Sequence, residues 1–548
     1  MIQESKNRGI HKMQRVIVIP IIVVVLLLGA CGKNPTDYNV VLISLDTTRS
    51  DYVDTGGGAK AFTPELKRFS RKSIVFERAY CTIPQTLPSH LSILTSCFPQ
   101  ECGVTSNQYQ YDHRHKMLQQ VLKEKGYMTA AVISLGTLSS STGIAEGFDY
   151  FLENLNEDTV FFTPAERVTH EGLQLLDKIK KEAFFLFLHY SDPHSPYAPP
   201  RINGCFKIEA DGKPVVQFNA HHGAILRKHI PLSRGTHHIH FKIENHEEDF
   251  DAFVIRRLVF SKNCSTEFQN ITYSKTHYNG AHVLKGKEGM IRIHCSDKGF
   301  VKIFQVIPLL NWKAAIKYYR LEVEYMDRFV GKFIGKMEKE KLLDKTIVVI
   351  TADHGEGLGE RERYFGHVRY LNRQFIEVPL IMHLPGVKTK RVTTPVSLIG
   401  ISPTLLEFLG IQDHSFNYQR SLYPVITSQN GRNTPGKTVY SFAFSPSAIE
   451  DKHCVIRWPY QGIFVKDFTG TISTETYNLL LSQSFRKLDE FSPDVLMRHS
   501  RKDYLALRRA SRQINGAFGK QNIQNIARLK PKSHEEEIEK LKTMGYLH

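Results

Sequence analysis

The sequence predicts an α/β fold with a mostly parallel central sheet, interrupted by an inserted antiparallel β domain. Short apolar runs without polar alternation recur along the chain, separated by stretches with helical periodicity. This is the pattern of parallel strands covered by helices on both faces. Residues 203–305 instead alternate apolar and polar side chains, as antiparallel strands with one exposed face do. With 548 residues, 41% of them hydrophobic, the chain can bury a large core, which excludes a disordered or polytopic membrane protein.

Four apolar runs are the expected strands of the central sheet. They cover residues 39–45, 129–134, 183–190 and 346–351. The clearest helix leads directly into the last run. Its apolar residues recur every three or four positions and are Ile316, Tyr319, Val323, Met326, Val330, Phe333 and Met337. Alternation of strands and helices of this kind builds a parallel sheet.

The N-terminal segment is a predicted export signal. Positive charges at Lys6, Arg8, Lys12 and Arg15 precede an uncharged, mostly apolar run over residues 16–30, which is short for a membrane span but typical of a secretory signal. The end of this run and Cys31 resemble the lipobox of bacterial lipoproteins. That resemblance implies removal of residues 1–30, lipidation of Cys31 and anchoring on the extracytoplasmic, periplasmic face, with Gly32 favouring the outer membrane. An uncleaved N-terminal anchor is the alternative, and it also tethers the chain to a membrane.

The remaining cysteines show no zinc-binding spacing, because no pair has the CxxC pattern. In an oxidising compartment two disulfides are expected candidates. They are Cys97 with Cys102, and a pair within Cys205, Cys264 and Cys295.

Acidic side chains follow two of the predicted strands. Asp46 comes directly after the first strand, and Asp353 and His354 come after the fourth. Ligands of parallel α/β sheets bind at the carboxyl ends of the strands, and two carboxylates with an imidazole suit a divalent metal such as Ca, Mn, Mg or Zn. Taken singly, each aspartate also fits a helix N-cap. The two together favour a metal site.

A third motif runs from Thr86 to Thr95, where a proline-containing turn opens an amphipathic helix. With the two strand-end motifs, it resembles the sulfatase family of the alkaline phosphatase superfamily. Further matching segments are Asp192-Pro193-His194-Ser195-Pro196-Tyr197, Val378-Pro379-Leu380-Ile381, residues 396–410 and residues 541–547. The resemblance implies an alkaline-phosphatase-like three-layer sandwich.

The resemblance also implies a domain division. The catalytic α/β domain covers residues 31–202 and 306–416, and the inserted β-rich domain covers residues 203–305. A smaller C-terminal subdomain with basic helices covers residues 417–548. An insertion beside the His194 motif could shape the active-site cleft, although fold analogy alone does not establish this.

The resemblance also implies a role for each matching residue of the site. Asp46, Asp353 and His354 would bind the metal, with Thr86 beside it as both metal ligand and nucleophile. Metal coordination favours the alkoxide of a threonine, which is otherwise a poor nucleophile. The remaining candidates would contact the transferred group or protonate the leaving oxygen, and they are His90, His194, His367 and Arg49.

The chain departs from the usual sulfatase motifs at the nucleophile. Thr86 occupies the position of the Cys or Ser that becomes formylglycine, so formylglycine is not expected, and His90 replaces the arginine. The family's Gly-Lys-Trp-His segment is absent after residues 126–131, and Thr47 replaces a second aspartate. Two basic substrate contacts are therefore missing. Threonine nucleophiles on this fold are associated with phosphoryl chemistry.

The net charge of the chain indicates which substrates and partners it could bind. The chain carries 72 Lys+Arg against 55 Asp+Glu, a net charge of +17, which suits an anionic ester on a glycan or lipid headgroup. Export and the lack of a recognition motif exclude nucleic acid. No protein partner can be inferred. A group of histidines in the insertion lacks regular ligand spacing and fits an exposed surface better than a metal site; its members are His221, His222, His229, His237, His238 and His240.

The sequence thus predicts a lipid-anchored, extracytoplasmic, metal-dependent hydrolase that cleaves a sulfate or phosphate ester through a covalent Thr86 intermediate. One alternative is a phosphoryl-headgroup transferase with the same site. The other is a catalytically silent glycan-binding lipoprotein. Related transferases carry several membrane spans where this chain has one short segment, and the retained Asp46, Thr86, Asp353 and His354 argue against a silent site.

Overall fold

The structure is a computed structural model. It describes residues 38–153, 163–195, 197, 205–219, 227–244, 250–274, 281–284, 288–310, 312–360, 364–428, 439–444, 450–457, 460–467 and 472–478. Several sequence predictions lie outside this part of the chain, namely the export signal, Cys31, His221, His222 and the C-terminal basic helices. Among the described residues, no helix combines the length and the apolar character that a bilayer crossing requires.

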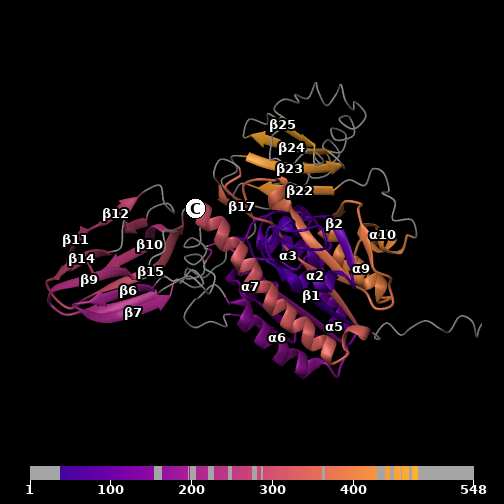
Figure 1. Ribbon diagram of the computed structural model, residues 1–548, viewed down its shortest axis with the longest axis horizontal. Coiled ribbons are helices and arrows are strands. Elements are labelled where there is room, and N and C mark those ends of the chain that lie inside the picture. Colours follow the sequence, from indigo (N-terminus) through magenta and orange to yellow (C-terminus); the bar gives the residue numbers. More distant parts are fainter. Residues whose placement is uncertain are drawn as a thin grey trace, which may run out of the picture.

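The central sheet is mostly parallel, as predicted (Figure 1). Its strand order is β20-β2-β19-β16-β1-β5-β3-β4, and β21 pairs with β2. Only β19 runs antiparallel to its neighbours, β16 and β2. The strand bounds are β1 Asn39–Leu45, β2 Ile74–Tyr80, β3 Met128–Val132, β4 Tyr150–Leu152, β5 Phe184–Tyr190, β16 Thr346–Thr351, β19 Glu377–His383, β20 Lys390–Val392 and β21 Val396–Ser397.

Helices cover both faces of this sheet. The side chains of Ser44 and His189 face helix α3, because the ring of His90 contacts both. The neighbouring Leu188 packs instead against Gly172 of α6. Since successive side chains of a strand point to opposite faces, α3 and α6 lie on opposite sides, which makes the three layers that the resemblance implies.

The helices and short turns outside the insertion are as follows. The α-helices are α2 Pro64–Ser70, α3 Thr86–Thr95, α4 Pro99–Cys102, α5 Leu118–Glu124, α6 Ala165–Ile179, α7 Trp312–Lys339, α8 Arg373–Ile376, α9 Ile401–Phe408 and α10 Tyr423–Thr427. The 3₁₀ turns are η1 Ser50–Tyr52, η2 Gly136–Leu138, η3 Ser140–Thr142, η4 Leu343–Lys345, η5 Leu398–Gly400 and η6 Tyr418–Arg420. A small ribbon pairs β17 Gly357–Leu358 with β18 Phe365–Gly366.

The insertion forms two five-stranded antiparallel sheets, ordered β12-β13-β10-β15-β8 and β11-β14-β9-β6-β7. Figure 1 shows them apart from the central sheet, beside the N-terminal end of α7. Its strands are β6 Cys205–Ala210, β7 Lys213–Asn219, β8 Arg227–Leu232, β9 Gly235–Glu244, β10 Phe250–Phe260, β11 Cys264–Gln269, β12 Ile271–Ser274, β13 Ala281–Leu284, β14 Glu288–Cys295 and β15 Gly299–Leu310. The expected boundary at residue 305 therefore falls inside β15.

The cysteine candidates separate into one disulfide and one pair of free thiols. Cys264 and Cys295 are cross-strand partners in β11 and β14 and form a disulfide. Cys97 and Cys102 are buried free thiols, so the disulfide suggested for them is absent. Their segment ends in α4, and the Cys102 thiol lies 3.2 Å from the Thr95 hydroxyl instead.

A four-stranded antiparallel sheet begins the C-terminal subdomain. It contains β22 Val439–Phe444, β23 Glu450–Arg457, β24 Tyr460–Asp467 and β25 Ile472–Asn478. The Phe442 amide donates to the carbonyl of Thr82 at 2.7 Å, and the Ser441 hydroxyl donates to that of Cys81 at 2.6 Å. The subdomain is thus bonded to the segment that leads into Thr86.

Candidate active site

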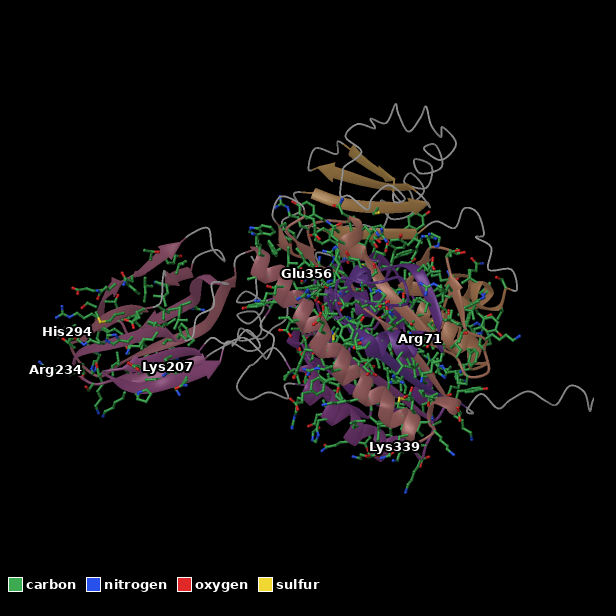
Figure 2. All side chains as sticks on the ribbon, viewed as in Figure 1. Arg71, Lys207, Arg234, His294, Lys339 and Glu356 are labelled. Carbon is green, nitrogen blue, oxygen red and sulfur yellow. A yellow bond between two sulfur atoms is a disulfide. The ribbon has the colours of Figure 1, made fainter. Side chains whose placement is uncertain are left out.

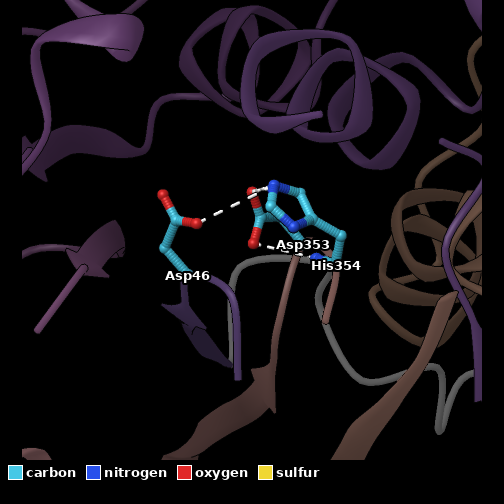
Figure 3. A group of neighbouring side chains, drawn as sticks. All are labelled: Asp46, Asp353 and His354. Atoms are coloured by element: carbon cyan, nitrogen blue, oxygen red, sulfur yellow. Dashed lines mark hydrogen bonds and ion pairs between the residues drawn. The ribbon is translucent and has the colours of Figure 1, made fainter. Parts of the chain in front are cut away.

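The predicted metal ligands meet at the carboxyl ends of two adjacent strands. Asp46 follows β1, and Asp353 and His354 follow β16, which pairs with β1 in parallel. His354 Nε2 lies 3.3 Å from Asp353 Oδ2 and 3.9 Å from Asp46 Oδ1 (Figure 3). One ligand atom of each residue lies within 4.8 Å of the others. Three side chains from two distant segments thus converge on one point.

Backbone donors fix the orientation of Asp353. Its Oδ1 accepts from the amides of Thr47 at 3.2 Å and His354 at 2.9 Å. Thr47 adopts a left-handed backbone with φ of 57°, which is uncommon for a β-branched residue and is characteristic of functional sites. With Oδ1 occupied, the second oxygen of Asp353 faces Asp46 and His354.

The tautomer of His354 follows from its surroundings. Its Nδ1 lies 2.9 Å from the carbonyl of Gly355, and because a carbonyl only accepts, Nδ1 must carry the proton. The Nε2 lone pair therefore points toward the carboxylates, as a metal-binding histidine requires. Gly355 permits this tight turn, since a Cβ atom there would lie 2.1 Å from the Gln374 carbonyl oxygen.

The three residues fit a divalent metal. Both carboxylate oxygens of Asp46 and the Oδ2 of Asp353 are buried and lack a hydrogen-bond partner among the described residues. Burial raises the pKa of Asp46 to about 7, and burial together with Asp46 raises that of Asp353. Unpaired buried carboxylates are costly. A cation between these oxygens would remove that cost.

Thr86 lies beside this group. It is the first residue of α3 and fully buried, and its hydroxyl donates to His354 Nε2 at 3.4 Å. The Ser89 hydroxyl donates to the Asp353 carbonyl at 2.7 Å and ties α3 to the turn after β16. A helix N-terminus favours negative charge, so this position suits an alkoxide or a bound anion.

His90, which the sequence predicts as an oxyanion contact, is hydrogen-bonded within the protein. Its Nδ1 donates to the Thr86 carbonyl at 2.7 Å, and its Nε2 accepts from the Ser44 hydroxyl at 2.8 Å. Both nitrogens are thus used within the protein. Burial lowers the pKa of this imidazole to about 4, so His90 is a neutral support for the nucleophile helix.

Arg49, the other predicted anion contact, is paired with carboxylates of the protein. Its guanidinium donates to both oxygens of Asp51, at 2.9 and 2.8 Å, and to Glu360. Its Nη1 also lies 3.3 Å from the carbonyl of Glu356. The side chain is 1% exposed. Arg49 therefore braces the segment after the metal ligands, and its charge is balanced by carboxylates.

His194 and His367 lie together at the site. Their rings are 5.0 Å apart, and His367 is 4.4 Å from the ring of His354. His194 Nδ1 donates to the Ser195 carbonyl at 2.7 Å, and His367 Nδ1 lies 3.3 Å from Glu356 Oε2. In both rings Nδ1 has a protein partner, which orients the ring. The structure thus brings both predicted histidines to the metal ligands.

Two residues near the site were missed by the sequence reasoning. His189 Nε2 lies 3.3 Å from Asp46 Oδ2, at the end of the apolar strand β5. The second residue is Glu356, which is fully buried inside the catalytic body (Figure 2). The figure also labels Lys207, Arg234 and His294, which lie on the insertion. Burial raises the pKa of Glu356 to about 8. The available signals were a histidine within an apolar run and an acid directly after the Asp-His motif.

Comparison with known proteins agrees with this fold. The sulfatase family model matches residues 38–411. An N-acetylglucosamine-6-O-sulfatase of Bacteroides thetaiotaomicron is 24% identical over 460 residues, covering 78% of this chain and 77% of that protein. The chain belongs to the sulfatase family, and it is accordingly a sulfuric or phosphoric ester hydrolase.

Solved structures share the fold. A protein determined in complex with its substrate D-glucosamine-2-N,6-O-disulfate superposes with a TM-score of 0.59 at 16% identity, covering 91% of this chain and 100% of that one. A phosphonate monoester hydrolase from Silicibacter pomeroyi superposes with a TM-score of 0.55 at 16% identity, covering the same shares. The alkaline-phosphatase-like architecture is therefore confirmed.

Proposed function

We propose that this protein is a metal-dependent hydrolase that transfers the sulfuryl or phosphoryl group of an ester to Thr86 and then to water. One observation carries the proposal. The Thr86 hydroxyl lies 3.4 Å from His354 Nε2, next to two buried carboxylates whose free oxygens suit a cation. A nucleophile at a helix N-terminus beside a metal site is the arrangement that such transfer needs.

The metal ligands and Thr86 have separate roles in the proposed reaction. Asp46, Asp353 and His354 would hold the cation, which when bound lowers the pKa of a neighbouring hydroxyl and offsets charge on the ester. Thr86 Oγ1 loses its proton to solvent and forms a bond to sulfur or phosphorus as the bond to the leaving oxygen breaks. Water then attacks the same atom and releases Thr86.

Proton supply to the leaving oxygen is assigned to the histidine pair. His194 and His367 are the two imidazoles beside His354 whose Nδ1 atoms have protein partners, the Ser195 carbonyl and the Glu356 carboxylate. Burial lowers the pKa of both imidazoles, that of His367 to about 4, so the proposed acid is an imidazole that takes up a proton as the anionic ester binds and passes it to the leaving oxygen. A proton from one of them avoids expulsion of a free alkoxide.

The substrate is proposed to be an anionic ester on a glycan. The sulfatase relative from Bacteroides thetaiotaomicron is named for N-acetylglucosamine 6-O-sulfate chemistry, and one solved relative binds a glucosamine disulfate. The net charge of +17 suits a polyanion. Lipid headgroup esters are the competing substrate, and the substrate panel below separates the two.

Membrane anchoring is a further part of the proposal. It rests on the apolar run over residues 16–30 and the cysteine that follows it, Cys31. Lipidation at Cys31 would hold the hydrolase on the extracytoplasmic face of a membrane. Replacement of Cys31 by serine should then abolish incorporation of a labelled fatty acid into the protein.

Turnover of a substrate panel tests the function. The metal-loaded protein is given aryl sulfate, phosphate monoester, phosphodiester and phosphonate esters, then sulfated glucosamine and a phospholipid. We expect one ester class to dominate, loss of that activity in Thr86→Ala and partial retention in Thr86→Ser, which keeps the hydroxyl. Equal activity of Thr86→Ala and the natural protein would refute the nucleophile.

A further inference from the structure

Two buried side-chain amides flank the nucleophile. Gln85 directly precedes Thr86, and Asn107 lies next to the first turn of α3. They are 2% and 1% exposed. Neither residue has a role in the site described so far.

The hydrogen bonds of these amides fix which way each one points. Asn107 Oδ1 accepts from the backbone amide of Leu87 at 2.9 Å, and Gln85 Oε1 accepts from that of Asn107 at 3.3 Å. The oxygens are therefore engaged, and the NH₂ groups point elsewhere. Gln85 Nε2 and Asn107 Nδ2 are both buried without an acceptor among the described residues.

Unpaired buried donors need an explanation, because each costs about 1–3 kcal/mol. Here both donors belong to residues on either side of Thr86 in the same hydrogen-bonded chain. An anion bound at Thr86 would supply the missing acceptors. The oxygens of a sulfuryl or phosphoryl group are such acceptors.

Neither His90 nor Arg49 fills this role in the part of the chain that the structure describes. The His90 ring carries a single proton and is neutral, because its Nδ1 donates a hydrogen bond and its Nε2 accepts one. Arg49 is paired with Asp51 and Glu360. Asp46 and Asp353 together match the charge of one divalent cation, so that cation would add no net positive charge.

We propose that Gln85 and Asn107 bind the nonbridging oxygens of the group transferred to Thr86, and that these neutral donors favour a group with one negative charge over a dianion. A sulfate monoester or a phosphate diester carries one such charge, whereas a phosphate monoester carries two at neutral pH. The inference rests on the proposed function, because it concerns the same site.

Isosteric substitutions test the donors. Gln85→Glu and Asn107→Asp each keep the oxygen that accepts from the backbone and replace only the NH₂ group. Loss of one oxyanion donor lowers the rate by about 100-fold or more, so we expect kcat/KM to fall by at least about that factor in each variant. Asn417→Asp is the matched control, since Asn417 Oδ1 also accepts a backbone amide, that of Gln419, at 3.1 Å in an exposed turn.

Two further measurements keep the test independent of folding and of turnover. Gln85→Met removes the donor without adding charge, and it should lower kcat/KM by about 100-fold; because it also removes the oxygen that accepts from the Asn107 amide, the melting temperature should fall, and kcat/KM is compared at a temperature where the variant is folded. Binding of 4-nitrophenyl sulfate to Thr86→Ala, followed by calorimetry, should weaken about tenfold or more when Asn107→Asp is added, since one lost hydrogen bond to a charged group is worth at least about 1.5 kcal/mol.

The outcomes separate the inference from the proposed function. If the natural protein turns over an ester and the folded variants stay within threefold of it, the amides are not the oxyanion donors. A natural preference for the phosphate monoester over the diester would overturn the charge selectivity. Absence of turnover with every ester would count against the proposed function alone, and the binding experiment would still decide the role of the amides.

Discussion

His354 turns its Nε2 toward the hydroxyl of Thr86, 3.4 Å away, because its Nδ1 donates to the carbonyl of Gly355. The same nitrogen lies 3.3 Å from Asp353 Oδ2. A single backbone hydrogen bond thus aims one imidazole at both the nucleophile and the carboxylates.

Replacement of one of the proposed metal ligands should weaken cation binding. Asp46→Asn replaces a charged oxygen ligand by a neutral one, and we expect the affinity for Mn²⁺ to fall by at least about 100-fold, because even residues one step removed from a metal are worth about 10–100-fold. Titration of Mn²⁺ followed by electron paramagnetic resonance measures this. Asp192→Asn is the control, since Asp192 is also buried but caps Ala165 outside the ligand group; equal affinities in both variants would argue against the site.

Replacement of His90 should destabilise the protein. His90→Leu leaves the Ser44 hydroxyl without the partner that it has at 2.8 Å and removes the side-chain bond of 2.7 Å to the Thr86 carbonyl, which keeps its helical backbone bond. Each unpaired buried group costs about 1–3 kcal/mol, so the melting temperature should drop clearly. His170→Leu, at an exposed position of α6, should leave it unchanged. A His90→Leu protein as stable as the natural one would mean that His90 does not support α3.

Asp327 of α7 should make stability depend on pH. It accepts from the amides of Glu65 and Leu66 at 3.1 and 2.9 Å, and burial raises its pKa from 3.8 to about 6. Because the folded pKa is the higher one, the folded state binds the proton more tightly, and stability from this group falls as pH rises from about 4 to about 6.

The rise in the pKa of Asp327 sets the size of this loss of stability. A rise from 3.8 to about 6 corresponds to about 3 kcal/mol in the free energy of unfolding. Urea unfolding at both pH values should show this loss in the natural protein and a flatter profile in Asp327→Asn. Parallel profiles in the two proteins would assign the pH dependence to other groups.

Loss of the disulfide should weaken the insertion and spare the catalytic body. Cys264 and Cys295 enclose a loop with a sequence separation of 31, and closing such a loop is worth about 3–4 kcal/mol. Limited proteolysis of Cys264→Ser combined with Cys295→Ser should cut first within residues 205–310, while Mn²⁺ binding stays unchanged. Cleavage starting in the catalytic body would show that the two parts depend on each other for stability.

Local patterns in the sequence sufficed to predict the parallel strands and the grouping of Asp46, Asp353 and His354. Residues 39–45 and 346–351 are continuous apolar runs, and each ends in an acid at the same edge of the sheet. The antiparallel direction of β19 was not predictable, because an apolar strand has the same composition in either direction.

The roles of individual side chains depended on distant partners. His90 appeared as a substrate contact in the sequence because it follows Thr86 by one helical turn, but its ring is bonded to Ser44, 46 positions earlier. Arg49 was likewise expected at the substrate, but it pairs with Glu360, 311 positions away. Such contacts depend on chain topology and leave no local signal. Gln85 and Asn107 are further examples, since an amide without an acceptor is visible only in three dimensions.

The covalent attachment site tests the account most directly. The metal-loaded protein is mixed with its best ester, quenched in acid within milliseconds, digested and analysed by mass spectrometry. We predict a sulfuryl or phosphoryl group on Thr86, absent from Thr86→Ala. A modified residue elsewhere, or turnover with no adduct on the peptide that contains Thr86, would contradict the assignment of Thr86 as the nucleophile.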